Sequence, residues 1–191
     1  MGKGKPTTAK GPVTTLRAIP LLPMIRKIMS NITLERIDER TEQYLSKSQS
    51  AYTKFRSTAD IVWAHRWLIS RIETYQERLH ITGIDMSAAF DTIRRVRLMT
   101  IVSSFLPEDE VRMIRYLLSN TTLTIKMKGA KSETFKSNIG SSQGDGFSGK
   151  LYTVYFETSL KELRPILDQA QVLPPTLPDE ATYADDADFI A

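Results

Sequence analysis

Two short segments of this chain carry aspartates at places where a strand meets a turn. Residues 81–86 read as a strand ending in Asp85, and residues 182–190 read as a strand, a tight turn with Asp185 and Asp186, and a second strand. Strand ends and tight turns both direct short side chains out of a sheet. If the two strands are neighbours, three carboxylates meet at one point. Together with the helices expected elsewhere in the chain, these strands indicate one α/β domain.

Such a carboxylate cluster requires cations, because like charges at close range repel and one carboxyl would otherwise take up a proton. The chain has no cysteine, and its two histidines, His65 and His80, are too far apart to form a compact metal clamp alone. Oxygen ligands favour Mg²⁺ or Mn²⁺. We therefore expect two such ions, roughly 3.5–4 Å apart, in a site for phosphoryl transfer.

The rest of the chain predicts helices separated by short strands. We expect Asp91 to be the N-cap of a helix that starts at Thr92, rather than a metal ligand. His65 lies on an apolar helical stripe and is expected in the core. Ser57 and Asp60 match a capping box before that helix. The expected helices cover about 25–45, 61–79, 92–105, 108–119 and 149–164, the last ended by Pro165, with a hairpin from 121–127 and 132–137.

A glycine-rich loop suggests an alternative. Residues 144–149 match the dinucleotide-binding pattern G-x-G-x-x-G, with Asp168 about twenty residues later. The preceding strand, residues 133–138, is polar, whereas the first strand of a dinucleotide-binding unit is buried on both faces. The match alone is weak support for a nicotinamide cofactor.

Composition and charge limit the classes of function. The chain has 191 residues with 26 Lys+Arg and 22 Asp+Glu. Residues 1–60 carry 11 basic and 5 acidic side chains, and residues 151–191 carry 2 and 8, which suits an anionic partner at one end and cations at the other. No segment is long and apolar enough to span a membrane, and no secretory signal is seen. We expect an intracellular protein without a membrane partner, and the sequence does not distinguish nucleus from cytoplasm.

Five blocks in order resemble the reverse transcriptase domain of non-long-terminal-repeat retrotransposons. Residues 16–28 are similar to the family's "RPISLLP…KI" segment and residues 49–58 to its "QxGFRxGRST" block. Residues 84–91, 140–145 and 183–186 resemble polymerase motifs A, B and C.

The resemblance implies a role for each matching residue. Asp85, Asp185 and Asp186 match the catalytic metal ligands, with Asp85 and Asp185 as the principal ones. Phe90 matches the gate that crowds a ribose 2′-OH. Gln143 and Gly144 match the nucleotide-binding positions of motif B. Arg56 matches a position that contacts the triphosphate, which its forked guanidinium suits.

The resemblance also implies an α+β fold, the fingers–palm portion of a right-hand polymerase with an antiparallel palm sheet packed on helices. We assign residues 1–15 to a flexible basic lead-in, 16–80 to a fingers-like helical part and 81–191 to the palm. The implied activity is RNA-directed DNA synthesis, with an RNA template, a DNA primer, deoxynucleoside triphosphates and two Mg²⁺ ions. In the family, motif D, the primer grip and the thumb follow motif C, whereas this sequence ends five residues after Asp186. We therefore expect the chain alone to be inactive.

Several positions depart from the family pattern. Phe55 stands where glycine is usual, Ala88 replaces a common lysine, and residues 147–149 continue motif B unusually. These departures keep open a catalytically inactive or co-opted remnant that only binds nucleic acid. An RNA-dependent RNA polymerase palm is a second alternative, although Phe90 argues against it.

Overall fold

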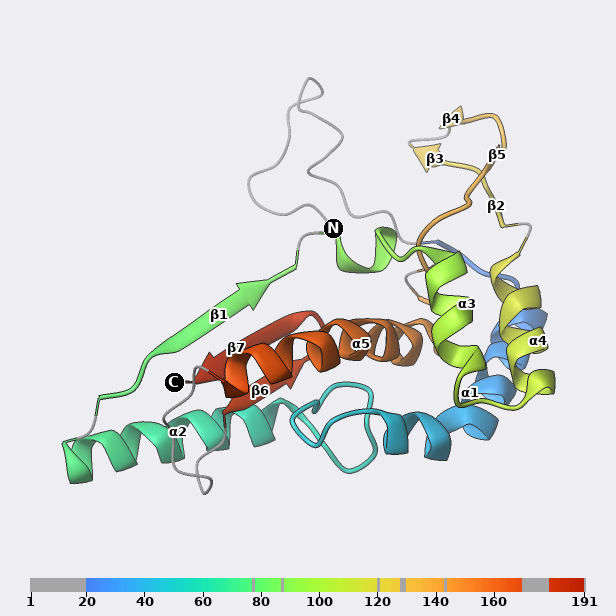
Figure 1. Ribbon diagram of the computed structural model, residues 1–191. Coiled ribbons are helices and arrows are strands. Elements are labelled where there is room, and N and C mark those ends of the chain that lie inside the picture. Colours follow the sequence, from blue (N-terminus) through green and yellow to red (C-terminus); the bar gives the residue numbers. More distant parts are fainter. Residues whose placement is uncertain are drawn as a thin grey trace.

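The computed structural model describes residues 20–76, 78–86, 88–119, 121–127, 130–142, 144–169 and 179–190. The lead-in expected at residues 1–15 lies outside these ranges. The elements, in chain order, are α1 (Met24–Tyr44), α2 (Thr58–Tyr75), β1 (Ile81–Asp85), the 3-10 helix η2 (Ala89–Asp91), α3 (Arg95–Ser103), α4 (Glu108–Leu118), β2 (Thr122–Leu123), β3 (Lys126–Met127), β4 (Ala130–Lys131), β5 (Phe135–Lys136), α5 (Ser148–Asp168), β6 (Glu180–Tyr183) and β7 (Asp186–Ile190) (Figure 1).

A three-stranded antiparallel sheet in the order β1-β7-β6 joins the distant segments. β6 and β7 form a hairpin with a two-residue turn, because Tyr183 is opposite Asp186. β1 pairs with β7 along its whole length, from Ile81 opposite Ile190 to Asp85 opposite Asp186. The two aspartate-bearing strands are therefore neighbours, as the sequence argument requires.

Helix α5 lies beside this sheet and forms the centre of the hydrophobic core (Figure 1). Its residues from Ser148 to Leu160 are mostly buried. α1 and α3 pack against α5, and α4 packs against both α1 and α3. Burying one large apolar side chain contributes about 1.5–3 kcal/mol, so this helical layer supports the sheet. Fully buried members of the core include Ile37, Ile93, Leu98, Val102, Ile114, Phe147, Leu151 and Val154.

The prediction that Asp91 caps a helix starting at Thr92 is wrong. Asp91 is the last residue of η2, and α3 begins only at Arg95. The backbone N–H groups of Asp91 and Thr92 both donate to the carbonyl of Ala88, at 2.9 and 3.1 Å. These bonds close a tight turn and leave no helix N-terminus for Asp91 to cap.

The expected end of α5 at Pro165 is also wrong, because the helix continues to Asp168. Proline removes one helical hydrogen bond but does not remove the contacts of its neighbours. Arg164 forms ion pairs with the buried carboxylates of Glu157 at 2.6 Å and Glu180 at 2.8 Å. These pairs fix the last turns of the helix against β6.

α2 begins with the predicted capping box. The Ser57 hydroxyl accepts a hydrogen bond from the helix, and the Asp60 carboxylate accepts one from the Ser57 N–H at 2.6 Å. His65 is half-buried between α2 and β7 rather than enclosed in the apolar core. Its Nδ1 lies 2.9 Å from the Ile61 carbonyl and its Nε2 lies 3.0 Å from the Asp188 carboxylate.

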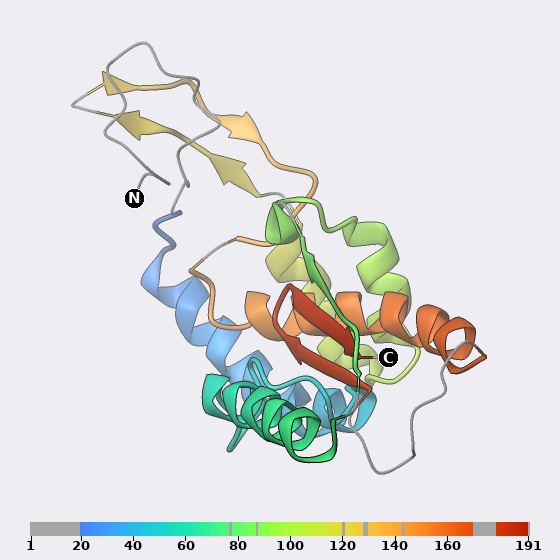
Figure 2. The same ribbon diagram turned by 90° about the vertical axis from the view of Figure 1, so that its left-hand side faces the viewer.

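The hairpin expected from residues 121–137 is present and projects from the body of the domain (Figure 2). It consists of two short ladders, β2 with β5 and β3 with β4. Because β5 belongs to this hairpin and the sheet beside α5 is antiparallel, the dinucleotide-binding alternative for residues 144–149 is contradicted.

None of the described helices has the length and apolar composition needed to cross a membrane.

Candidate active site

The backbones of Asp85, Asp185 and Asp186 lie at one corner of the sheet. Asp85 ends β1 and is directly opposite Asp186, the first residue of β7. Asp185 occupies the two-residue turn between β6 and β7. Opposed residues in an antiparallel pair have Cα atoms about 4.5–5.5 Å apart. The structure therefore brings together the backbones of all three aspartates.

The negative charges at this corner repel one another. Burial raises the pKa of Asp186 above its ordinary value, and the nearby charges of Asp185, Asp85 and Asp188 raise this pKa further. In the described part of the chain, no three His, Cys, Asp or Glu side chains are grouped closely enough to hold a metal ion. The available ligands are all carboxylate oxygens, which fit Mg²⁺ or Mn²⁺, and a cation would relieve the repulsion.

A buried glutamine holds the turn that carries Asp185. The Oε1 atom of Gln49 accepts the N–H of Ala184 at 3.1 Å and the N–H of Ala51 at 2.9 Å. Ala184 has φ +57°, in the left-handed region that costs a non-glycine residue energy. Gln49 is 1% exposed and bridges to Thr182 of β6. The segment between α1 and α2 therefore fixes the shape of the turn.

An aromatic pair lies beside the carboxylates. The rings of Phe90 in η2 and Tyr152 in α5 have centroids 4.9 Å apart. Burial raises the pKa of Tyr152, and the charges of Asp185 and Asp186 raise this pKa further. The phenol is therefore protonated at neutral pH. Packing against this buried ring restricts the position of Phe90.

The loop that leads from β5 to α5, termed here the glycine loop, packs against η2. The N–H of Gly140 donates to the carbonyl of Ile93, and the N–H of Ser141 donates to that of Phe90, both at 2.9 Å. Gly140 has φ +75°, and an added Cβ would lie 3.0 Å from the backbone of Asp91. Gly144 also has a positive φ, +96°. Gln143 lies outside the described residues.

Arg95 fixes the approach to this loop. Its guanidinium donates to the carbonyls of Gly140 at 2.8 Å, Ser137 at 2.7 Å, Leu118 at 2.7 Å and Ile139 at 3.2 Å. Burial lowers the pKa of Arg95, and the charge of Arg26 lowers this pKa further, but the group remains charged. One side chain thus ties α3, α4 and the glycine loop together.

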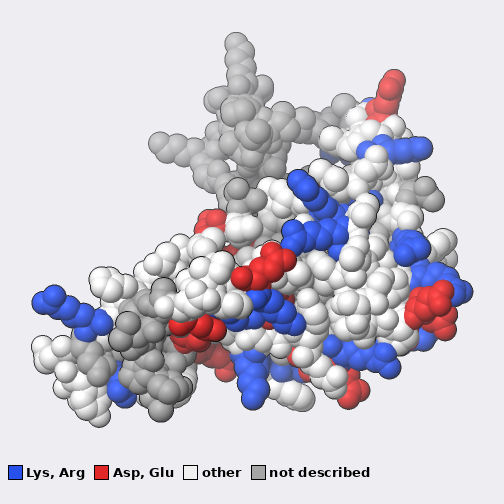
Figure 3. Space-filling model, viewed as in Figure 1, with Lys and Arg blue, Asp and Glu red and all other residues white. Residues whose placement is uncertain are grey.

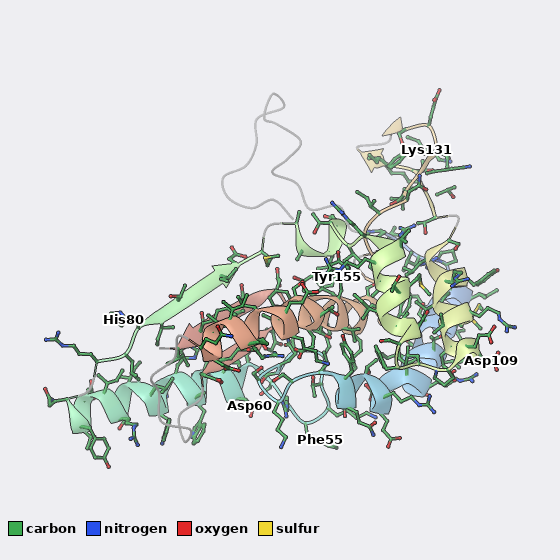
Figure 4. The ribbon with its side chains drawn as sticks, in the orientation of Figure 1. Phe55, Asp60, His80, Asp109, Lys131 and Tyr155 are labelled. Carbon is green, nitrogen blue, oxygen red and sulfur yellow. The ribbon has the colours of Figure 1, made fainter. Side chains whose placement is uncertain are left out.

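Arg56 is engaged within its own loop. Its guanidinium donates to the backbone carbonyls of Lys47 and Gln49. Phe55, the residue before it, has φ +60° and a fully exposed side chain (Figure 4). Glycine adopts this conformation without strain, which gives a physical reason for the glycine that is usual at this position of the family pattern.

The unusual residues 147–149 have a packing reason. Phe147 is fully buried in the core at the start of α5. At Gly149 an added Cβ would lie 2.2 Å from the ring of Tyr52. Burial raises the pKa of Tyr52, and the charges of Tyr183 and Asp185 raise this pKa further. Glycine at position 149 therefore makes room for a tyrosine that lies close to the carboxylate corner.

The sequence argument missed three residues of this site. Gln49 belongs to a quoted motif block but received no role, and no local pattern predicts its contact with the turn. Arg95 and Tyr152 stand outside the quoted blocks. Their roles depend on tertiary contacts with the glycine loop and with Phe90, respectively.

The model of the family described as reverse transcriptase (RNA-dependent DNA polymerase) matches residues 4–189. The chain belongs to the reverse transcriptase family. No curated protein matches this reverse transcriptase domain significantly. It is similar to solved telomerase structures, one being apo telomerase from Candida tropicalis, truncated from its C-terminal domain, with 17% identity and a TM-score of 0.54. Coverage in that comparison is 87% of this chain and 33% of the telomerase.

A second similar structure is telomerase from Candida albicans in complex with a TWJ fragment of telomeric RNA. The identity is 12% and the TM-score 0.57, covering 87% of this chain and 30% of the telomerase. These identities show a shared fold. The reverse transcriptase domain spans about a third of the length of these telomerases. The expected α+β fold, helices with an antiparallel sheet in a fingers–palm arrangement, is confirmed.

Proposed function

We propose that this domain is the fingers–palm part of an RNA-directed DNA polymerase, which adds deoxynucleotides to a DNA primer on an RNA template. One observation carries the proposal: the β1–β7 pairing sets Asp85 opposite Asp186, with Asp185 in the adjoining turn. The similar telomerase from Candida albicans has been solved with RNA, which supports an RNA partner. The order of the motif blocks supports the non-long-terminal-repeat type.

The aspartates would supply the metal ligands of this reaction. Asp85 and Asp185 would be the principal ligands of two Mg²⁺ or Mn²⁺ ions, with Asp186 beside them. Bound ions of this kind activate the primer 3′-OH and neutralise the triphosphate and the leaving pyrophosphate. The Gln49 hydrogen bond to Ala184 would hold the Asp185 turn in place while substrate binds.

Other residues would position and select the nucleotide. Phe90, supported by Tyr152, would crowd a ribose 2′-OH and favour deoxynucleotides. Gly144 and Gln143 would lie along the incoming nucleotide and the template. Arg56 would have to exchange its two backbone carbonyl partners for phosphate oxygens. This exchange replaces neutral acceptors by charged ones, which form stronger hydrogen bonds.

Primer extension on an RNA template with MgCl₂ tests the proposal. It should be measured with the chain itself and with the chain joined to the thumb of a full-length relative. We expect Asp185→Asn to lower the extension rate by about 100-fold or more, because metal contacts supply several kcal/mol in the transition state. Asp168→Asn, at the exposed end of α5, is the matched control. Equal rates for the parent and Asp185→Asn would contradict the assignment.

The gate role of Phe90 has its own test, which separates this proposal from an RNA polymerase. Phe90→Ala should increase ribonucleotide incorporation relative to deoxynucleotide incorporation by the same enzyme. Unchanged sugar selectivity would count against a gate at this position.

A nucleic-acid-binding remnant is a second candidate function. The engagement of the Arg56 guanidinium by backbone carbonyls favours it, because that side chain is not directed to a triphosphate in this arrangement. Salt-dependent RNA binding without any primer extension, even with a thumb supplied, would support the remnant.

A further inference from the structure

The hairpin of residues 121–137 has a basic, hydroxyl-rich face and an apolar face. Side chains alternate between the two faces of a strand. On the apolar face Leu123 is opposite Phe135, and the exposed side chain of Ile125 follows on the same strand. The other face, termed here the lysine face, consists of three cross-strand pairs: Thr122 with Lys136, Thr124 with Thr134, and Lys126 with Lys131.

A one-residue bulge creates the lysine face. Between the two ladders, residues 124–125 of one arm face residues 132–134 of the other. The extra residue is accommodated where Ser132 bonds twice to Ile125, by an N–H···O bond of 2.8 Å and through its hydroxyl at 2.9 Å. In a regular ladder Ser132 would be opposite Lys126. The bulge instead sets Lys131 there.

This arrangement costs energy in the isolated chain. Like charges directly opposite each other destabilise an antiparallel pair. Among the described residues, no acidic side chain forms an ion pair with Lys126, Lys131 or Lys136. The only acidic residue of the hairpin, Glu133, falls within the bulge. The lysine face thus suits an external anion that would neutralise the opposed lysines.

The hairpin starts at the edge of the candidate active site. Its returning arm runs through Ser137 and Ile139, which accept bonds from Arg95, into the loop docked on η2. From there it projects outward, with Lys131 near its tip (Figure 4). Figure 3 shows basic and acidic side chains on this projection. A nucleic-acid strand that passes beside the carboxylate corner would therefore continue along the hairpin.

We propose that the lysine face binds the phosphate backbone of the nucleic acid, outside the carboxylate corner. Lys136 and the opposed lysines are separated by about 13 Å along the strands, four residues at about 3.3 Å each. A nucleic-acid strand presents a negative charge at every nucleotide over such a length. The identification of the anion as nucleic acid rests on the proposed function. The contact itself requires neither metal nor catalysis.

Binding of a fluorescent single-stranded RNA, followed by anisotropy over a series of KCl concentrations without divalent ions or nucleotides, tests this. We expect Lys126→Ala with Lys131→Ala to weaken binding at least about fivefold and to reduce the slope of log K against log salt by about 1.4. The charge-matched control is Arg66→Ala with Arg78→Ala, on and after α2 and away from the hairpin (Figure 1). This control should change the slope of log K against log salt less than the Lys126→Ala/Lys131→Ala variant does.

A second variant separates position from charge. Ile125→Lys with Lys126→Ile keeps the composition but moves one lysine to the apolar face, and it should also weaken binding. Parent-like affinity and slope in both hairpin variants, or no RNA binding by the folded parent, would overturn the proposal. Equal competition by polyglutamate would contradict the choice of nucleic acid. Because this binding assay contains neither divalent ions nor nucleotides, a failure of catalysis is distinguishable from a failure of this contact.

Discussion

Asp85 and Asp186 are directly opposite each other across the β1–β7 ladder, although 101 positions separate them in the sequence. Directly opposed like charges destabilise an antiparallel pair. The adjoining carboxylate of Asp185 increases the repulsion. Burial also disfavours the charged form of Asp186, and together these effects raise the pKa of Asp186. The stability of this corner should therefore depend on divalent cations.

We expect MgCl₂ to raise the thermal midpoint of the parent protein, since a ligand that binds only the folded state stabilises it. Asp186→Asn should raise the midpoint without Mg²⁺, by removing repulsion, and should weaken the response to Mg²⁺. Differential scanning fluorimetry measures both, with Asp168→Asn as the control. Identical Mg²⁺ responses in all three proteins would argue against a cation site at this corner.

Gln49→Leu should destabilise the domain by about 1–3 kcal/mol, because two buried N–H groups lose their acceptor. Guanidinium unfolding measures the loss, and hydrogen exchange at the Ala184 amide should accelerate more than exchange in α4. Gln43→Leu, at an exposed position of α1, provides the control. Unchanged exchange at Ala184 would show that the turn does not depend on this hydrogen bond.

Phe55→Gly should stabilise the domain by about 0.5–1 kcal/mol, since glycine adopts a left-handed backbone without the steric cost that phenylalanine incurs. The fully exposed ring at this position contributes no burial that would be lost. Val96→Gly is the matched comparison, because Val96 is exposed in α3, where glycine is unfavourable. Urea unfolding should therefore give opposite signs for the two substitutions, and a loss of stability in Phe55→Gly would contradict the strain argument.

Asp38→Asn should cost about 3–5 kcal/mol at neutral pH, because removing one partner of a buried pair leaves the other charge uncompensated. Asp38 of α1 lies 2.7 Å from both Lys150 and Lys54, and the Lys150 side chain is 3% exposed. Among the described acidic residues, Lys150 of the variant would retain only Glu42 as an ion-pair partner, at 3.5 Å.

The pH dependence of this effect has a definite sign. Burial tends to raise the pKa of Asp38, but hydrogen bonds and charges from Lys150 and Lys54 outweigh it and hold the pKa below its ordinary value. The stabilisation is therefore present above the unfolded pKa of about 3.9 and is lost as pH falls through the folded value. Urea unfolding of parent and variant should show a gap that narrows below about pH 4. Glu39→Gln, an exposed control on α1, should show little gap, and a pH-independent gap for Asp38→Asn would refute the ionic explanation.

The sequence predicts those parts of the site that depend on local pattern and motif order. Alternating strands and turn residues indicated the strands carrying Asp85 and Asp186, and the pairing of β1 with β7 agrees with the hypothesis that they are neighbours. The capping box before α2 was predictable because Ser57 and Asp60 interact locally.

Features that depend on tertiary contacts could not be predicted in this way. The contacts of Arg95 join segments more than twenty residues apart. α5 passes Pro165 because Arg164 is clamped by Glu157 and by Glu180 of a distant strand. Local propensity indicates neither arrangement.

β1 is paired only with β7 among the described strands, and every residue of β1 is exposed. The position of Asp85 thus depends on a five-residue ladder at the rim of the sheet rather than on the helical core. Rim strands fray at a lower free energy than that of global unfolding. Heat or mild denaturant should therefore separate Asp85 from its two partners, and end any joint action of the three carboxylates, while the helices remain folded.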